Sequence, residues 1–589
     1  MRDITRDRMM ARFLAVIVAI VALRVPAWSA PVPDRTATAA VPHATGGFTV
    51  YQDGAPLESG SPDFSRDVKT IERLGTAQRL INYPAGYQVD LPPDAEMNFR
   101  YSPAYVRASS PALDIKISRE RSPYGDVEMY LRDYPNRFIA REDYAFYRQV
   151  NDIRLIDDTW LESSGRRIRF ISFRRQPAAG SPEAQNEYAL AYIVTPGRQE
   201  FYALFFRTDS LDEQRPAILG ILESFTPVER RGTERFNLDL HPVPGRWNQE
   251  TRALYDRLSS GGRFMWGIFY PWAVTRPEAY QRVASIEGRL GFRFPVVLHY
   301  LYVGSDFPTE GMRNAFERGQ LIELTMQVAT LDNGNANLRN ANFDLLDGRL
   351  DEAIRRFARG AKEFGHPFLF RLNNEMNTDW AQYSGVCTLN DVDIYTKVWC
   401  RIYRIFDEEG VDNAIWVFNP NGRNYPPMNW NRGVCYYPGN GFVHLIGLTG
   451  YNTGDYYYSV TREHWVSFRQ IYDPIVAECR KLYARFPWLI TEFACSSVGG
   501  DKAQWIDDMF AALPGYPEIR GAVWWSYADF DYRPGREGTP ARRYWLDEKD
   551  EYLDAFREGL RRQGLLEQTA KIEQAGQTEQ TDEGSRGSD

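Results

Sequence analysis

The chain has 589 residues, of which 43% are hydrophobic and 25% are charged, and its formal net charge is −8. This length predicts two or three domains rather than one. The negative net charge argues against a nucleic-acid-binding protein, because there is no basic excess to neutralise phosphates. Aromatic residues make up 14% of the chain. Most should fill cores, but such an excess is also typical of clefts in which rings stack on sugars.

The N-terminus has the pattern of an export signal. Four arginines precede the apolar run FLAVIVAIVAL, and Ala27 and Ser29 occupy positions −3 and −1 for cleavage before Ala30. The apolar run is short for a bilayer span, so an uncleaved membrane anchor is the less favoured alternative. We therefore expect residues 1–29 to be a signal peptide and the mature chain to be secreted or periplasmic.

Residues 30–46 are small, Pro-rich and polar, which is typical of a linker. Residues 47–230 then combine strand-like runs with few helices. The clearest runs with alternating apolar residues are 112–118, 166–173, 187–194 and 199–207. A TPGR turn between the last two predicts a hairpin, and 212–225 has helical spacing. These features predict a small α+β domain without a catalytic cluster. We expect it to be an accessory domain that docks to the cell envelope or to a glycan.

A different hydrophobic pattern follows a second predicted linker at 231–260. From 261 to 565, short apolar runs alternate with amphipathic helical stretches such as 350–365 and 392–410. The eight strand-like runs are 264–270, 294–302, 321–327, 367–373, 413–419, 443–452, 487–493 and 521–527. Eight strands alternating with helices predict an α/β fold, a (β/α)8 TIM barrel, although a doubly wound open sheet would give the same alternation. The polar tail at 566–589 is expected to be disordered.

The carboxyl ends of the predicted strands are where a (β/α)8 barrel places its active site. Two of these ends carry a glutamate: Glu375 after the fourth strand and Glu492 at the end of the seventh. An acid buried at a strand end is costly unless it is paired or used. Two facing carboxylates suit the cleavage of a glycosidic bond, in which one donates a proton and the other attacks or stabilises the anomeric centre.

Other residues at the strand ends fit sugar binding. Asn374 is placed to donate a hydrogen bond to a sugar 2-hydroxyl, and Tyr451 to donate one to Glu492 and hold it ionised. Trp380 and Trp524 are expected to stack on sugar rings. Because Trp524 and its neighbour Trp525 point to opposite faces of a strand, only one of them can face the cleft; we assign Trp524, which is in phase with Ser526.

No His, Cys or Asp cluster has metal-ligand spacing, so neither a metal nor another cofactor is expected. The five cysteines all lie between residues 387 and 495. An odd number in an exported chain leaves at least one without an intramolecular partner. Cys387 and Cys435, both in loop-like sequence, are the pair expected if a disulfide forms; the alternative is that all five are reduced.

Several motifs, in order along the chain, resemble glycoside hydrolase family 26. Its strand-four signature is matched by Arg371, Glu375, Met376, Asn377 and Trp380. The segments that resemble its fifth to eighth strands are 414–422, 436–452, 489–497 and 521–529. Two positions differ from mannanases of this family. Asn374 stands where they usually carry His, and it agrees with the wider clan of retaining β-glycosidases. The third strand ends in LTMQVAT, where they commonly place a Trp.

This resemblance implies a retaining endo-β-glycanase that hydrolyses a β-linked polysaccharide, either β-mannan or a β-glucan or xylan, by double displacement. Glu375 would be the acid/base and Glu492 the nucleophile. The residues implied to bind substrate are Arg371, Asn374, Trp380, Tyr451 and Trp524. Two alternatives stay open: a non-catalytic carbohydrate-binding protein on a barrel scaffold, and a hydrolase of a bacterial exopolysaccharide. The chain is expected to be a monomer.

Overall fold

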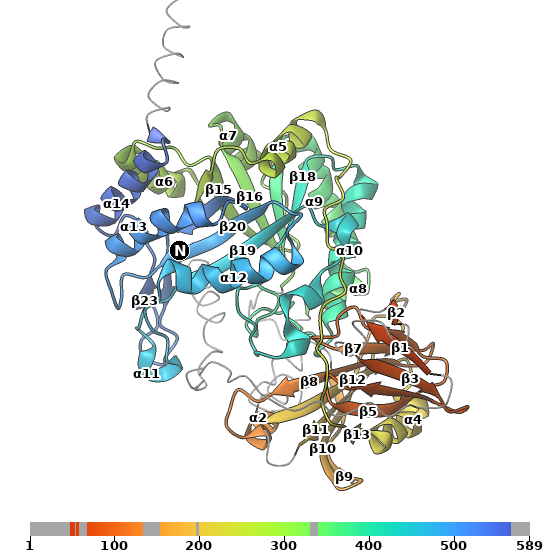
Figure 1. Cartoon of the computed structure of the whole chain (residues 1–589). Coiled ribbons are helices and arrows are strands. Elements are labelled where there is room, and N and C mark those ends of the chain that lie inside the picture. The colour runs from red at the N-terminus through yellow and green to blue at the C-terminus, as the bar shows by residue number, and fades with distance from the viewer. Residues whose placement is uncertain are drawn as a thin grey trace, which may run out of the picture.

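The computed structural model describes residues 48–52, 55–57, 68–133, 153–195, 199–329 and 340–566. The predicted signal peptide and the first predicted linker lie outside these residues, as does the predicted tail from residue 567 onward. Within the described part, no helix is both long enough and apolar enough to cross a membrane. The described residues form a β-rich domain followed by a larger barrel (Figure 1).

The β-rich domain contains two antiparallel sheets. The first has the strand order β13 (Thr226–Pro227), β5 (Tyr87–Leu91), β4 (Gln78–Asn82), β3 (Lys69–Arg73), β1 (Phe48–Gln52) and β2 (Ala55–Leu57). The second has the order β6 (Glu96–Asn98), β7 (Val106–Ser109), β8 (Asp114–Arg121), β12 (Glu200–Thr208), β11 (Glu187–Val194), β10 (Arg166–Arg175) and β9 (Ile153–Ser163). The domain also contains the helices α2 (Val127–Asp133) and α4 (Leu211–Ser224).

The strand runs predicted for this domain are confirmed as β8, β10, β11 and β12, and β11 pairs with β12 in the antiparallel sense expected of a hairpin. The predicted helix is α4, which begins after Ser210, whose side chain accepts a hydrogen bond from the Glu213 backbone N–H. Its buried residues Ile218, Ile221 and Leu222 recur at helical spacing and join the core of the domain.

The barrel is closed and consists of eight parallel strands. They are β14 (Met265–Phe269), β15 (Val296–Tyr302), β16 (Leu321–Gln327), β17 (Phe368–Leu372), β18 (Ala414–Phe418), β19 (Leu445–Asn452), β20 (Trp488–Cys495) and β21 (Ile519–Trp525). All eight predicted strands are confirmed. The pairing of β14 with β21 closes the sheet and excludes the doubly wound alternative.

Helices alternate with the strands around the barrel. They are α5 (Gln249–Ser260), α6 (Pro277–Leu290), α7 (Thr309–Glu317), α8 (Ala341–Leu346), α9 (Asp351–Phe364), α10 (Val392–Glu409), α11 (Tyr458–Thr461), α12 (Phe468–Leu482), α13 (Lys502–Ala512) and α14 (Asp550–Arg562). Short 3-10 turns are η3 (Asn429–Asn431), η4 (Gly433–Tyr436), η5 (Asn440–Phe442) and η6 (Leu513–Gly515), and a small hairpin joins β22 (Ala528–Phe530) to β23 (Pro540–Arg543). The predicted helices 350–365 and 392–410 are α9 and α10, and each ends at a glycine with positive φ.

The stretch expected to be a linker up to residue 260 contains α5. This helix packs Leu254, Tyr255 and Leu258 against the first residues of barrel strands, among them Leu369 of β17 and Leu445 of β19. It therefore covers the amino end of the barrel, and the carboxyl end is left for a site.

The expected Cys387–Cys435 disulfide is wrong: the structure contains no disulfide between these residues, both of which are buried. Burial raises the pKa of the Cys435 thiol to about 12. Disulfide formation requires a thiolate, and this environment disfavours it.

Candidate active site

The two predicted carboxylates lie at the same end of the barrel. Glu375 lies three residues after the end of β17, and Glu492 lies in the carboxyl half of β20 opposite Thr449 of β19. Glu492 is 6% exposed, and Glu375 is also mostly buried. The charge of Glu492 raises the pKa of Glu375, so the two carboxylates interact electrostatically across the barrel mouth.

Three hydrogen-bond donors converge on Glu492. The Tyr451 hydroxyl donates to Oε1 at 2.5 Å, as the sequence predicted, and Arg371 Nη2 donates to Oε2 at 3.1 Å. The Tyr300 hydroxyl also donates to Oε2 while accepting a 2.6 Å hydrogen bond from Arg371 Nη2. Burial, and then the nearby Glu492 charge, raise the pKa of Tyr451 well above its usual value, so this phenol stays a donor. Such a set of donors stabilises an ionised carboxylate and fixes its direction.

Arg371 does not bind substrate as predicted, because it has no exposed surface. Its remaining donors are held by neighbouring strands: Nε donates to Thr325 Oγ1 at 2.7 Å, and Nη1 donates to Asn419 Oδ1 at 3.0 Å. A guanidinium with this many fixed partners cannot reach a ligand. Its role is instead to carry a buried positive charge beneath Glu492.

A third carboxylate, Glu323 on β16, was not predicted. It is fully buried, and its Oε1 lies 3.0 Å from Arg371 Nε. Burial raises the pKa of Glu323 to about 8, against the opposing effect of Arg371. At neutral pH Glu323 is therefore mainly protonated. The positive charge of Arg371 is then left to interact with Glu492. A lone acid inside the apolar run LIELTMQ was the signal that could have revealed it.

Glu375 has a different environment from Glu492. Burial, and then the Glu492 charge, raise the pKa of Glu375 to about 8. Three contacts oppose this shift: a 2.5 Å hydrogen bond from Asn421 Nδ2 to Oε1, the Arg371 charge, and a hydrogen bond from Trp380. The carboxyl of Glu375 is consequently protonated near neutral pH, which is the state a proton donor needs.

The backbone around Glu375 is strained. Asn373 and Glu375 have φ values of 47° and 58°, in the left-handed region that non-glycine residues rarely adopt. The surrounding contacts hold this conformation: Glu375 N donates to Asn419 O at 2.8 Å, and Val328 N donates to Asn373 Oδ1 at 2.7 Å. Strain maintained in this way is typical of functional sites.

Asn374 and Trp380 lie where the sequence placed them, beside Glu375. Asn374 Oδ1 accepts hydrogen bonds from Gln327 Nε2 at 3.2 Å and from the Tyr383 hydroxyl at 3.3 Å. With the oxygen held by these two donors, the Nδ2 amide is the group left to donate to a ligand. The Trp380 ring lies 5.4 Å from that of Tyr425 and remains partly exposed.

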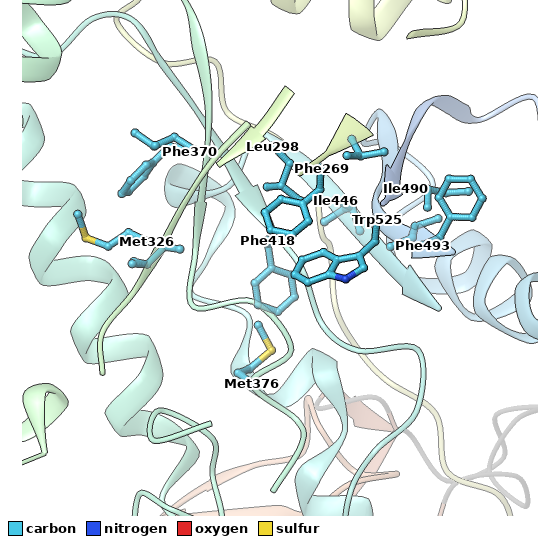
Figure 2. Packing of buried hydrophobic residues seen from close by; sticks show 14 of the residues in the cluster. Phe269, Leu298, Met326, Phe370, Met376, Phe418, Ile446, Ile490, Phe493 and Trp525 are labelled. Carbon is cyan, nitrogen blue, oxygen red and sulfur yellow. The ribbon is translucent and has the colours of Figure 1, made fainter. Parts of the chain in front are cut away.

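The assignment of Trp524 to the cleft is wrong. Trp524 has no exposed surface, donates from Nε1 to Tyr544 O at 2.9 Å, and packs edge-on against Phe493. Its neighbour Trp525 points to the other face of β21. The Trp525 ring stacks on Phe269 with ring centroids 3.9 Å apart (Figure 2). The Trp525 ring also meets the Tyr300 ring, with centroids 5.5 Å apart. Trp525 is therefore the tryptophan on the side of Glu492.

Sequence reasoning thus missed Tyr300 and Asn421 as members of the site, and it chose Trp524 where Trp525 was the correct member of the pair. Tyr300 stands near the end of the second strand and Asn421 in the NPNG segment after the fifth, so their positions at strand ends were the available signal. In the described part of the chain, no group of three or more His, Cys, Asp and Glu side chains could hold a metal ion.

A closed (β/α)8 barrel with two carboxylates in unlike environments at its carboxyl end has the arrangement of a glycoside hydrolase. The comparison with protein families gives a similarity that agrees with this arrangement. Residues 327–478, from the end of β16 into α12, match the model of glycosyl hydrolase family 26. Over these residues the chain is similar to family 26 glycoside hydrolases.

Individual relatives match parts of the chain. Endoglucanase H of Acetivibrio thermocellus is 29% identical over 297 residues, which cover 49% of this chain and 30% of the relative. A mannan endo-1,4-beta-mannosidase of Bacillus subtilis strain 168 is 31% identical over 112 residues, covering 18% of this chain and 29% of the relative. The chain thus spans about 30% of the length of these curated relatives. Among solved structures, the catalytic domain of a Bacillus sp. JAMB-750 family 26 endo-beta-1,4-mannanase aligns with 55% of this chain and 92% of its own, at 16% identity and a TM-score of 0.42.

Proposed function

We propose that this protein is a retaining endo-β-glycanase that hydrolyses β-mannan, or a β-glucan or xylan, by double displacement. The observation that carries the proposal is the contrast between two carboxyl groups at one barrel mouth. Glu492 accepts hydrogen bonds from Tyr451 and Arg371, whereas burial and then the Glu492 charge raise the pKa of Glu375 to about 8. One protonated and one ionised carboxyl group are what glycoside hydrolysis with retention requires.

In the first step, a carboxylate oxygen of Glu492 forms a bond to the anomeric carbon while the bond from that carbon to the leaving oxygen breaks. Glu375 transfers its proton to the leaving oxygen. Arg371 and Tyr451 hold the Glu492 carboxylate in one orientation, so the attacking oxygen needs no reorganisation when the sugar arrives.

In the second step, Glu375 acts as a base. Once Glu492 is an ester it carries no charge, and one of the two causes that raise the pKa of Glu375 is removed. The pKa of Glu375 therefore falls when a base is needed. Glu375 takes a proton from water, the resulting hydroxide attacks the anomeric carbon, and Glu492 leaves as a carboxylate with the anomeric configuration retained.

Substrate contacts follow from the side chains around the pair. The free amide of Asn374 donates to the 2-hydroxyl of the sugar whose anomeric carbon reacts, and Trp380 and Trp525 supply aromatic surface for sugar rings. Relatives named as an endoglucanase and as a mannan endo-1,4-beta-mannosidase support β-glucan and β-mannan as the first substrates to test.

Loss of the nucleophile tests the proposal. The wild-type chain is screened for released reducing sugar on mannan, lichenan, xylan and several bacterial exopolysaccharides, and Glu492→Ala is assayed on the active polymer. The variant should lose activity by about 10⁴-fold or more, because the covalent route is removed. Added azide should restore cleavage of an activated aryl glycoside and form the α-glycosyl azide. Glu363→Ala, a substitution of a glutamate that is 70% exposed, is the matched control. Full activity in Glu492→Ala would refute the mechanism.

A wild-type chain that binds glycans on an array but releases sugar from none would support the non-catalytic alternative.

We further propose that the chain is exported, as its N-terminal pattern indicates, and that it acts as a monomer. We also propose that outer faces of the N-terminal domain contact the cell envelope or a glycan. Fractionation of cells that express the full chain, and light scattering on the purified protein, test export and the monomeric state.

A further inference from the structure

The N-terminal domain lies at the carboxyl end of the barrel, on the opposite end from α5 (Figure 1). Its contacts go to loops that follow three successive barrel strands. In the first of them, Arg175 forms a 3.1 Å ion pair with Asp347, which lies between α8 and α9, and neither side chain is more than 1% exposed. These βα loops are the part of the fold that builds an active site.

A buried cluster of six charges makes the second contact. Its members are Arg107, Lys116, Arg207 and Asp114 of the N-terminal domain and Asp391 and Asp393 at the start of α10. Lys116 Nζ lies 2.9 Å from Asp393 Oδ1, and Arg207 Nη1 lies 2.8 Å from Asp391 Oδ2. Burial opposes ionisation of Asp393, yet Lys116 and the two arginines lower its pKa well below the usual range. Three cations balance three carboxylates, and each carboxylate in this largely buried interface needs its partner. The domain is therefore fixed on the barrel rather than tethered to it.

Glu120 on β8 makes the third contact. Its side chain is buried, and its carboxylate accepts hydrogen bonds from Asn429 N at 2.6 Å and Trp430 N at 3.2 Å. These two N–H groups open η3, in the loop after β18. Asn429 Nδ2 donates back to Arg119 O at 2.6 Å. Burial raises the pKa of the Glu120 carboxyl group to about 7, and the hydrogen bonds from Asn429 and Trp430 oppose this shift. A buried carboxyl group that accepts from the first N–H groups of a 3-10 turn fixes both the place and the direction of that turn.

From η3 a chain of hydrogen bonds reaches Glu375. Asn431 Nδ2 donates to Asn377 O at 3.0 Å, two residues after Glu375. Asn377 then exchanges two hydrogen bonds with Asn421: Asn421 N donates to Asn377 Oδ1 at 2.8 Å, and Asn377 Nδ2 donates to Asn421 O at 3.0 Å. Asn421 is the residue whose side-chain amide donates to Glu375 Oε1.

We propose that the N-terminal domain helps to form the active site by fixing the loops at the carboxyl end of the barrel. Within it, Glu120 is a positioning residue for the proton donor Glu375. The inference rests on the proposed function, since it assigns to Glu120 the orientation of that reaction's acid/base. It predicts that loosening η3 disturbs Asn377 and Asn421 and thereby moves the carboxyl group of Glu375, while Glu492 is left in place by its own partners in the barrel.

The dependence of rate on the leaving group tests this role. A 2,4-dinitrophenyl glycoside needs no protonation to leave, whereas a phenyl glycoside does. Both are made on cellobiose and mannobiose, and kcat and KM are measured for the full chain and for Glu120→Gln, which has one acceptor in place of two. The variant should lose about tenfold in kcat/KM on the phenyl glycoside and less than about twofold on the dinitrophenyl glycoside.

Matched variants separate positioning from loss of structure. Glu162→Gln, on β9 of the same domain, changes a side chain that is 70% exposed and should behave as wild type. Glu120→Asp keeps the charge and should give a smaller loss on the phenyl glycoside. Equal losses on both glycosides, or no loss in Glu120→Gln, would overturn the inference. A wild-type chain that cleaves no glycoside and no polysaccharide would overturn the proposed function itself, and the inference with it.

Discussion

Arg371 Nη2 donates a 3.1 Å hydrogen bond to Glu492 Oε2 from a position without solvent exposure. Arg371 is flanked on its other side by Glu323, whose pKa is raised to about 8 by burial. One buried cation thus stands between two acids, of which only Glu492 faces the barrel mouth. The positive charge of Arg371 therefore acts mainly on Glu492, the carboxylate that the proposed reaction needs.

Replacing this cation tests its electrostatic role. Arg371→Met should reduce kcat by about 10²-fold or more, because a fixed charge next to the nucleophile is lost. It should also lower the free energy of unfolding by about 3–5 kcal/mol, the usual effect of removing one partner from a buried ion pair. Arg371→Lys keeps the charge but not the planar set of donors. Its kcat and its free energy of unfolding should therefore lie between those of Arg371→Met and wild type. Steady-state kinetics and urea unfolding measure both effects; a Met variant with wild-type kcat would contradict the role.

The raised pKa of Glu375 predicts the alkaline limb of the pH profile. Because the proton donor works only in its acid form, kcat/KM should fall above about pH 8, where the carboxyl group of Glu375 ionises. The measurement is kcat/KM on the phenyl glycoside between pH 5 and pH 10, and the dinitrophenyl glycoside is the control because its departure needs no proton. A profile that stays flat to pH 10 would show that a different group donates the proton.

The same shift predicts a dependence of stability on pH. In the folded chain Glu375 holds its proton up to about pH 8, whereas in the unfolded chain it releases it near the ordinary value of 4.5. Between these values the folded state binds more protons, so the contribution of Glu375 to stability is present below about pH 4.5 and is lost as pH rises towards 8. Glu375→Gln has no carboxyl group to ionise, so its stability should not fall with rising pH for this reason. The variant should therefore melt at a higher temperature than wild type at pH 9 and show a smaller difference at pH 5, by calorimetry at both pH values. The reverse order would mean that the carboxylate form is the one stabilised by the fold.

The sequence was sufficient for the barrel but not for the details of its mouth. The eight strands could be predicted because each is a short apolar run between helices of regular spacing. The two glutamates could be predicted because an acid at the end of such a run is costly unless it is used. Tyr300 and Glu323 could not be assigned to Glu492 and Arg371, because those contacts join strands that are far apart in the sequence and that meet only in the closed barrel.

The error at Trp524 has a specific cause. The prediction took its phase from Ser526, but β21 ends at Trp525, so Ser526 lies beyond the alternating part of the strand. Ser526 is itself fully buried, and its Oγ accepts a hydrogen bond from Leu546 N at 3.1 Å. A residue after the end of a strand does not report which face the strand's side chains occupy.

Asn374 should act through a single hydroxyl of the substrate. Its oxygen is held by Gln327 and Tyr383, which leaves the amide to donate to a sugar 2-hydroxyl. Asn374→Ala should lower kcat by about 10- to 100-fold on an aryl glycoside that has this hydroxyl, because the contact strengthens at the transition state. On the matching 2-deoxy glycoside, Asn374→Ala and wild type should have similar rates. Equal losses on both glycosides would contradict a contact with the 2-hydroxyl.

The two neighbouring tryptophans give a matched pair of substitutions. Trp524→Ala empties a fully buried site and should lower the free energy of unfolding by about 3–5 kcal/mol, with activity per folded molecule largely kept. Trp525→Ala removes the ring that stacks on Phe269 beside Tyr300, so it should raise KM and lower kcat by about tenfold even where the chain is fully folded. Circular dichroism establishes the folded fraction, and kinetics on the active polysaccharide at a temperature well below unfolding give the activity. Because the two changes remove the same ring from adjacent positions, the opposite ranking in activity would show that Trp524 faces the substrate.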